Sequence, residues 1–229
     1  MSYNPYLANT AQTQAQRGIM TQVYACMTAG LLLTGAVAQF TFSSGFADAI
    51  LFSPLVLVLF LVQLGVVWFL SARINRMAPA TATMTFLGYS VLSGITLAPI
   101  FYRYTDESIG YTFLITGGMF AAMSAIGYVT KRDLSGMGSF LFMGLIGFIL
   151  ASIVNIFLQS SALYWILTYA GIAIFVGLTV YDTQKIKQWS SRVSNGDDAH
   201  RVAIMGALSL YLNFINLFLL LLRLFGNRR

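Results

Sequence analysis

The sequence has 229 residues, of which 58% are hydrophobic and only 9% are charged. Charged residues make up about 25% of ordinary soluble domains, so this composition excludes a soluble protein and indicates an integral protein of the lipid bilayer. The formal net charge of +6 does not indicate nucleic acid as a partner, because the basic residues stand singly or in pairs between apolar runs. The polar tail formed by residues 1–17 lacks the features of a signal peptide, and no cleaved leader is expected.

Charged residues divide the remainder into six charge-free runs. These are residues 18–47, 49–72, 77–102, 108–130, 134–181 and 202–222. A membrane-spanning helix needs about 20 residues, so the run 134–181 predicts two helices, with the polar cluster Gln159, Ser160 and Ser161 as their turn. The alternating segments of a β-barrel are not seen. The sequence therefore predicts an all-α integral membrane protein with seven transmembrane helices, in a single domain over residues 18–229.

The basic residues predict the orientation of these helices. With a cytoplasmic N-terminus, the inner side holds nine basic residues and the outer loops hold only Arg103. The inner set is Arg17, Arg73, Arg76, Lys131, Arg132, Lys185, Lys187, Arg192 and Arg201. Seven crossings place Arg223, Arg228 and Arg229 outside, against the rule. Either the tail is an exception or the last segment enters and returns, and we favour seven full crossings.

Small residues in the third to fifth helices are expected to let helix backbones approach closely. They include Gly94, Gly117, Gly118, Gly144 and Gly147. Pro99 removes a backbone hydrogen bond and is expected to kink the third helix near its outer end.

Asp182 is the acidic residue that follows a long apolar run, in the segment VYDTQKIK. An ionisable residue at membrane depth usually has a partner, water or a task, so Asp182 is a candidate proton or cation site. The alternative is an interfacial acid that pairs with Lys185 or Lys187. The residues alone favour neither interpretation.

The last run, 202–222, carries polar side chains on one stripe. Ser209, Asn213 and Asn216 follow at helical spacing, while leucine and phenylalanine cover much of the remaining surface. Amides facing lipid would be poorly compensated, so we expect this helix to be largely enclosed by the others.

Four segments together resemble the Bax inhibitor-1 (transmembrane Bax inhibitor motif) family, in its bacterial inner-membrane branch. They read GYSVLSGITLAPI, TKRDLSGMGSFLFMGLIGFILASIVNIFLQ, VGLTVYDTQKIK and MGALSLYLNFINLFLLLLRLFGNRR. The resemblance covers the second to seventh helices. It implies a C-terminal helix that is central and wrapped by the other six, and a pH-sensitive leak for Ca²⁺ in the inner membrane. It also implies that two aspartates, in a YD and a YLDFINLF motif, control the leak.

By position, the first aspartate of the family is Asp182 and the second falls on Asn213, which departs from the family pattern. Two neighbouring carboxylates share a proton and attract a divalent cation, whereas a carboxylate and an amide do not. Asp182 therefore stays a candidate Ca²⁺ site, and Asn213 predicts a closed or weakly conducting leak. Ser209 and Asn216 are candidates for keeping the helix contact polar. The resemblance also implies a pairing arginine near the end of the second helix, where Arg73 and Arg76 both fit.

An enzyme is not expected, because the sequence has a single histidine, no H-E-x-x-H motif and no Walker glycine loop. No cofactor is expected, and Ca²⁺ is the expected permeant ion. A different class stays open, namely a non-conducting regulator that binds another membrane protein, such as a membrane-anchored protease, through its polar N-terminal tail. A coupled transporter is a third possibility, which would move a second solute against its gradient.

Overall fold

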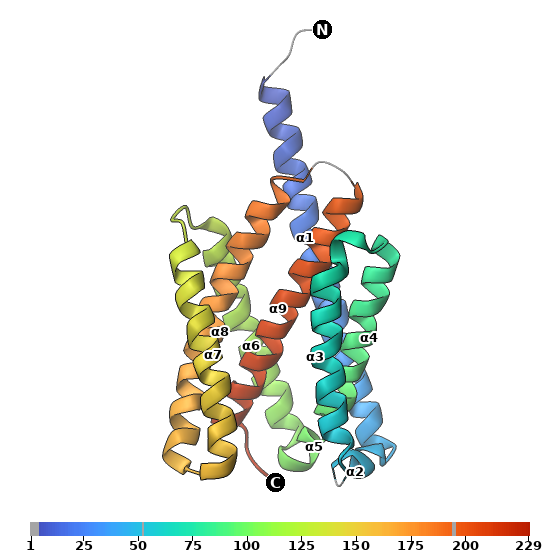
Figure 1. The fold of residues 1–229 in the computed structure, drawn as a ribbon, viewed down its shortest axis with the longest axis vertical. Coiled ribbons are helices and arrows are strands. Elements are labelled where there is room, and N and C mark those ends of the chain that lie inside the picture. The colour runs from blue at the N-terminus through green and yellow to red at the C-terminus, as the bar shows by residue number, and fades with distance from the viewer. Residues whose placement is uncertain (1–4, 52, 194–195) are drawn as a thin grey trace. The chain divides into compact units, whose positions relative to one another are not determined.

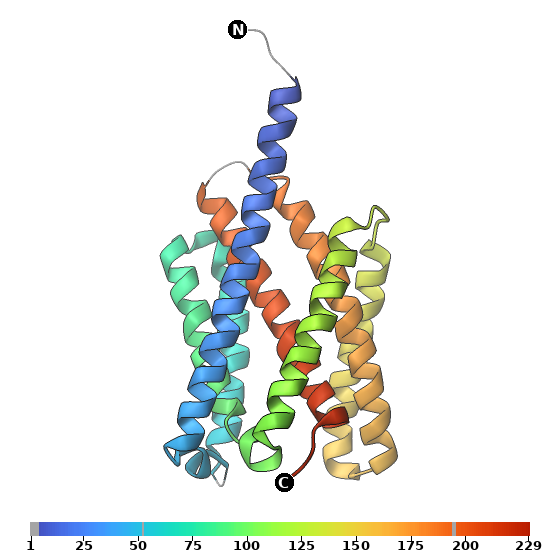
Figure 2. The ribbon, with the colours of Figure 1, turned by 180° about the vertical axis from the view of Figure 1, so that it is seen from behind.

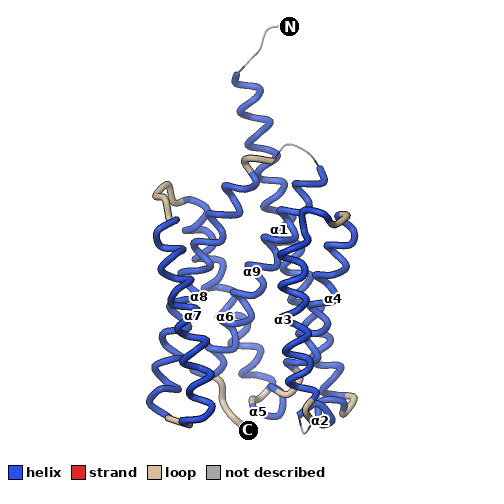
Figure 3. Tube along the Cα trace, in the orientation of Figure 1, coloured by secondary structure: helices blue, strands red, loops and turns tan. Residues whose placement is uncertain are grey.

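The computed structural model describes residues 5–51, 53–193 and 196–229, with the side chains of residues 5–12 and 51 left out. Helices account for nearly all of this part of the chain, and short loops join them (Figures 1 and 3). In chain order they are α1 (Pro5–Ser43), α2 (Phe46–Leu51), α3 (Leu55–Arg73), the 3₁₀ turn η1 (Ile74–Arg76), α4 (Pro79–Leu97), α5 (Ile100–Arg103), α6 (Asp106–Val129), α7 (Ser135–Leu158), α8 (Ser161–Ser190) and α9 (Gly196–Phe225).

Seven of the described helical segments are long and apolar enough to cross a membrane, which confirms the predicted fold class. The seven are α1 from Thr13 onward, α3 with η1, α4 with α5, α6, α7, α8 and α9. The 48-residue run divides where the sequence predicted, because α7 ends at Leu158 and α8 begins at Ser161. Gln159 ends α7 in the left-handed conformation with φ 49°, and the Asn155 side chain accepts from the backbone of Ser160.

Two prolines shape the third span. Pro79 occupies the first position of α4, where its fixed φ suits a helix and no N–H is needed. Pro99 interrupts the span, because α4 ends at Leu97 and the short α5 begins only at Ile100. The predicted kink is therefore a break in the helix.

The chain divides into two compact units. Unit 1 contains α1 to α5 together with Ile186–Tyr211, and its core lies between α1 and α4. Gly30 fits against Phe86 and Ser90 there, since an added Cβ would lie 2.7 Å from the Phe86 ring. The N-terminal turns of α1 extend past the ends of α3 and α4 (Figure 2). The predicted polar tail thus includes helix from Pro5, in a stretch rich in alanine and glutamine.

Unit 2 contains Tyr104–Lys185 and Leu212–Arg229. Its buried apolar cluster joins α7, α8 and α9 through Leu141, Phe175, Leu178, Leu217, Leu220 and Leu221. Phe214 of α9 also meets the ring of Phe120 of α6 edge to face, with centroids 5.6 Å apart.

Burial differs sharply among the spans. Two thirds of the apolar window of α9 is buried (67%), against 39% in α4 and 6% in α3 and α7. The apolar side chains of α3 and α7 are therefore available to lipid, whereas α9 packs mainly against protein. The central position of α9 stays a prediction.

The C-terminal residues are anchored within unit 2. Thr105 donates its backbone N–H to the carbonyl of Asn227, and Arg229 pairs with Asp106 at 2.9 Å. Arg228 donates to the hydroxyl of Tyr164, near the start of α8, at 3.2 Å. The end of α9 therefore lies at the same end of unit 2 as the starts of α6 and α8, as a full crossing by α9 requires.

Candidate functional site

Residues 180–184 of α8 make a run of contacts with different parts of unit 2. Two glycines leave room for the first two of these residues, Val180 and Tyr181. A Cβ added to Gly127 of α6 would meet the carbonyl of Val180, and one added to Gly138 of α7 would overlap the ring of Tyr181. The absence of side chains at these glycines lets α8 approach both helices closely.

The third residue of this run, Asp182, contacts α9. The side-chain Nδ2 of Asn213 donates a hydrogen bond of 2.7 Å to Oδ2 of Asp182. Asn213 is only 5% exposed, and Asp182 is half-buried. Lys185 lies one turn further along α8, with its Nζ 5.5 Å from the centroid of the Tyr181 ring. The structure thus brings together the two residues that the sequence placed at the family's aspartate positions.

The next two residues hold α8 to the α6 side of the unit. The hydroxyl of buried Thr183 donates to Ser124 of α6 at 3.3 Å. The Gln184 amide binds the loop between α6 and α7 at both of its ends: Nε2 donates to the carbonyl of Arg132 at 2.7 Å, and Oε1 accepts from the backbone N–H of Leu134 at 3.1 Å. This loop is therefore fixed to the helix that carries Asp182.

The other predicted site residues lie elsewhere. Asn216 donates to the carbonyl of Leu212 on its own helix at 2.8 Å, so its amide already has a partner. Ser209 lies in the part of α9 that belongs to unit 1. The candidate arginines also belong to unit 1: Arg73 lies at the end of α3 and Arg76 at the end of η1. The roles proposed for these three residues stay predictions.

Sequence reasoning assigned no role to Tyr211, which is the centre of a polar contact in unit 1. Its side chain is fully buried, and its hydroxyl lies 2.7 Å from that of Thr34 on α1. Thr34 donates to the carbonyl of Ser90 on α4 at 2.9 Å, and the Tyr211 ring meets the Phe86 ring edge to face. The feature of the sequence that could have pointed to Tyr211 was a tyrosine inside the apolar run 202–222.

His200 makes further polar contacts that the sequence did not reveal. Its Nδ1 lies 2.6 Å from Nε2 of Gln22 on α1, and its Nε2 lies 2.9 Å from the hydroxyl of Thr83 on α4. Both ring nitrogens thus hold α9 to other helices of unit 1. Among the described residues, no group of three or more His, Cys, Asp or Glu side chains could hold a metal ion. The candidate Ca²⁺ site at Asp182 stays a prediction.

These features define a class of protein: a seven-span α-helical membrane protein with a half-buried carboxylate in contact with a buried amide between two helices. Residues 16–229 match the family model described as "Inhibitor of apoptosis-promoting Bax1". The chain therefore belongs to the Bax inhibitor-1 family, which confirms the resemblance drawn from the sequence.

Similar proteins occur in distant bacteria. "Inner membrane protein YbhL" of Escherichia coli K12 is 52% identical over 214 residues, which is 92% of each chain. A protein of Borreliella burgdorferi is 43% identical over 213 residues, again 92% of each chain. The protein RP147 of Rickettsia prowazekii is 40% identical over 243 residues, which covers 100% of this chain and 99% of its own length.

Proposed function

We propose that this protein is a cation leak of the bacterial inner membrane, with Ca²⁺ as the permeant ion and a cytoplasmic N-terminus. The family membership, the name of the Escherichia coli relative and the excess of basic residues in the expected inner loops support this proposal. Asp182 is the gating carboxylate, and Asn213 makes the leak weaker and less dependent on pH than a pair of aspartates would.

The observation that carries the proposal is the hydrogen bond between Asn213 and Asp182. An amide carries both a donor and an acceptor, so it can bond the ionised carboxylate through N–H and the protonated acid through either group. The contact between α8 and α9 is therefore retained in both protonation states of Asp182. Two carboxylates at this separation would instead repel each other by a few kcal/mol when both are ionised.

The test is Ca²⁺ flux from liposomes that contain the purified protein, measured over a range of pH. Asn213→Asp should raise the flux, and the increase should grow with pH as both carboxylates ionise. Asn216→Asp is the matched control, because it adds a carboxylate to the same helix at a position whose amide donates to the carbonyl of Leu212 on that helix.

The flux measurements distinguish the possible interpretations of the site. A flux and a pH dependence unchanged by Asn213→Asp would contradict the role of the α8 contact. An equal increase in Asn216→Asp would show that added charge on α9, rather than the Asp182 contact, controls the flux. If Asp182→Asn keeps the pH response of the parent, then Asp182 is an interfacial acid only.

One observation favours the second candidate, a non-conducting regulator of another membrane protein such as a membrane-anchored protease. The N-terminal turns of α1 extend past α3 and α4 (Figure 2). Residues 13–15 are exposed. Gln16 then donates to the carbonyl of Lys187 at 2.9 Å, which ties the base of this extension to unit 1. Deletion of residues 1–16 distinguishes the candidates. A cellular phenotype lost while flux is retained supports the regulator, and the reverse result supports the leak.

A further inference from the structure

Unit 1 contains a pocket of about 540 Å³ at the end where α3 finishes and α9 begins. Ile74 and Asn75 of η1 line it on one side, and Asp198 and Arg201 from the first turns of α9 line it on another. Trp189, near the end of α8, completes this part of the wall. Asp182 and Asn213 belong to unit 2 and are not among the residues that line this pocket.

The wall formed by α9 changes from polar to apolar along the helix. Asp198 and Arg201 are followed in the lining by Val202 and Met205. A helix rises about 1.5 Å per residue, so Asp198 and Met205 are separated by about 10 Å along the axis. Tryptophan, here Trp189, is typical of the boundary between a membrane and water. A ligand with a polar end and an apolar body matches this gradient.

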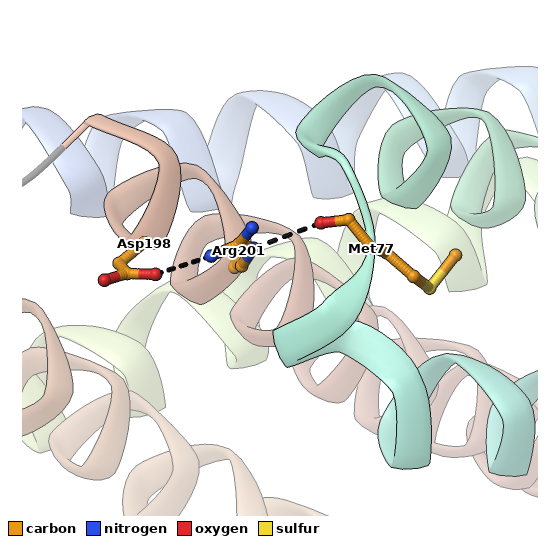
Figure 4. A network of polar contacts seen from close by, with 3 residues as sticks. All are labelled: Met77, Asp198 and Arg201. Atoms are coloured by element: carbon orange, nitrogen blue, oxygen red, sulfur yellow. Dashed lines mark hydrogen bonds and ion pairs between the residues drawn. The ribbon is translucent and has the colours of Figure 1, made fainter.

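Arg201 supplies the positive group of the pocket. Its Nε donates to the carbonyl of Met77 at 3.1 Å, and its Nη1 pairs with Asp198 at 2.7 Å (Figure 4). A guanidinium has five N–H donors, and these two bonds fix its plane while they use only two of them. The side chain of Arg201 keeps 23% of its surface exposed, so part of it can be reached by an anion.

The chain segments that line the pocket carry more basic than acidic residues. Arg73 and Arg76 flank the lining residues of η1, and Arg192 precedes the lining residue Val193; all three are exposed. With Arg201 they make four basic residues in these segments, against two acids, Asp197 and Asp198. This balance favours a ligand with a negative charge.

We propose that the pocket binds the headgroup of an anionic phospholipid of the adjoining leaflet. The phosphate contacts Arg201, and the glycerol and first acyl carbons lie on Val202 and Met205. Basic residues at a membrane surface each contribute about 1 kcal/mol to the attraction of anionic lipid, or about a fivefold preference. A zwitterionic lipid of the same shape lacks the net charge and should bind less well.

The test uses the fluorescence of Trp189 in nanodiscs. Trp68→Phe and Trp165→Phe leave Trp189 as the single tryptophan of the full chain. Brominated phosphatidylglycerol, diluted into phosphatidylcholine, should quench Trp189 more than the same fraction of brominated phosphatidylcholine. Arg201→Gln should reduce this preference about fivefold, and Arg73→Gln with Arg76→Gln should reduce it while leaving the bonds of Arg201 in place. Arg103→Gln, an exposed arginine elsewhere in unit 1, should leave the preference unchanged.

Three results would overturn the proposal. Equal quenching by the two brominated lipids would show that the pocket does not select charge. Loss of the preference on addition of millimolar inorganic phosphate would assign the pocket to free phosphate. A preference that survives in a variant lacking Arg73, Arg76 and Arg201, with the helical circular dichroism of the parent, would place the anionic lipid elsewhere.

Discussion

Asn213 donates its side-chain N–H to the carboxylate of Asp182 at 2.7 Å, between two helices that otherwise meet through apolar side chains such as Phe175 and Leu217. A polar pair in such surroundings is costly to break on one side only, because the remaining partner loses its hydrogen bond. Breaking the pair should therefore affect both the stability of unit 2 and the function proposed for Asp182.

Asn213→Leu tests that link, because it keeps the size of the side chain but removes the donor to Asp182. We expect the free energy of unfolding to fall by about 1–3 kcal/mol, measured by unfolding in mild detergent. The double variant Asp182→Leu with Asn213→Leu should recover much of the loss, since both polar groups are then gone. A single variant as stable as the parent would show that the bond contributes nothing to folding.

Gly138→Ala and Gly127→Ala should each destabilise the protein, because the added methyl group overlaps the ring of Tyr181 or the carbonyl of Val180. Overpacking of this kind costs about 1–3 kcal/mol. Gly117→Ala is the matched control, since nothing lies within 4 Å of a Cβ added there. Thermal unfolding in detergent should rank the control at or above the parent. Equal losses at all three positions would indicate a general effect of alanine and contradict the close approach of α8.

Gln184→Leu should release the loop between α6 and α7, because it removes the bonds to the backbone of Arg132 and Leu134. Hydrogen exchange of residues 130–134 should become faster by at least tenfold, which corresponds to about 1.4 kcal/mol of lost protection. Gln188→Leu, an exposed glutamine one turn further along α8, provides the control. Unchanged exchange in Gln184→Leu would mean that other contacts hold the loop.

Asp133 in this loop should make the start of α7 sensitive to acid. Bonds from the hydroxyl of Ser135 at 2.6 Å and then from its backbone N–H at 3.0 Å lower the pKa of Asp133 below its usual value of 3.8. A lowered pKa means that the stabilisation is fully present above the pKa of the unfolded chain and is lost as pH falls through the lower folded value.

Protection of the Ser135 amide should therefore stay constant at neutral pH and fall below about pH 4, as measured by hydrogen exchange. Ser135→Ala removes the larger cause and should return the pKa of Asp133 toward its usual value. Asp133→Asn should abolish this acid-dependent step. Its persistence in Asp133→Asn would assign it to another carboxyl group.

The number and order of the spans could be predicted from the sequence, because charge-free length alone determines whether a segment can cross a bilayer. The turn at Gln159 was also predictable, because the run 134–181 is long enough for two spans and the polar cluster marks the point between them. The helical start of α1 at Pro5 was not, since polar helix-forming residues resemble a tail when hydropathy is the only criterion.

The positions of Asp182 and Asn213 came from a motif, but their bond and its surroundings did not. Helical spacing does not say which glycines face another helix: nothing lies close to a Cβ added at Gly117, whereas Gly127 and Gly138 accept α8. Likewise Tyr211 and His200 make contacts with residues more than 100 positions away, which no local pattern reveals.

The anchored C-terminus has a practical consequence for experiments on orientation. Asn227, Arg228 and Arg229 are bonded to residues at the starts of α6 and α8, so a reporter enzyme joined to Arg229 would pull on those contacts. Its signal would then report on a disturbed protein. Ser160→Cys in the short turn between α7 and α8, made together with Cys26→Ser and labelled from one side of the membrane, would locate the same end of unit 2 without disturbing the tail.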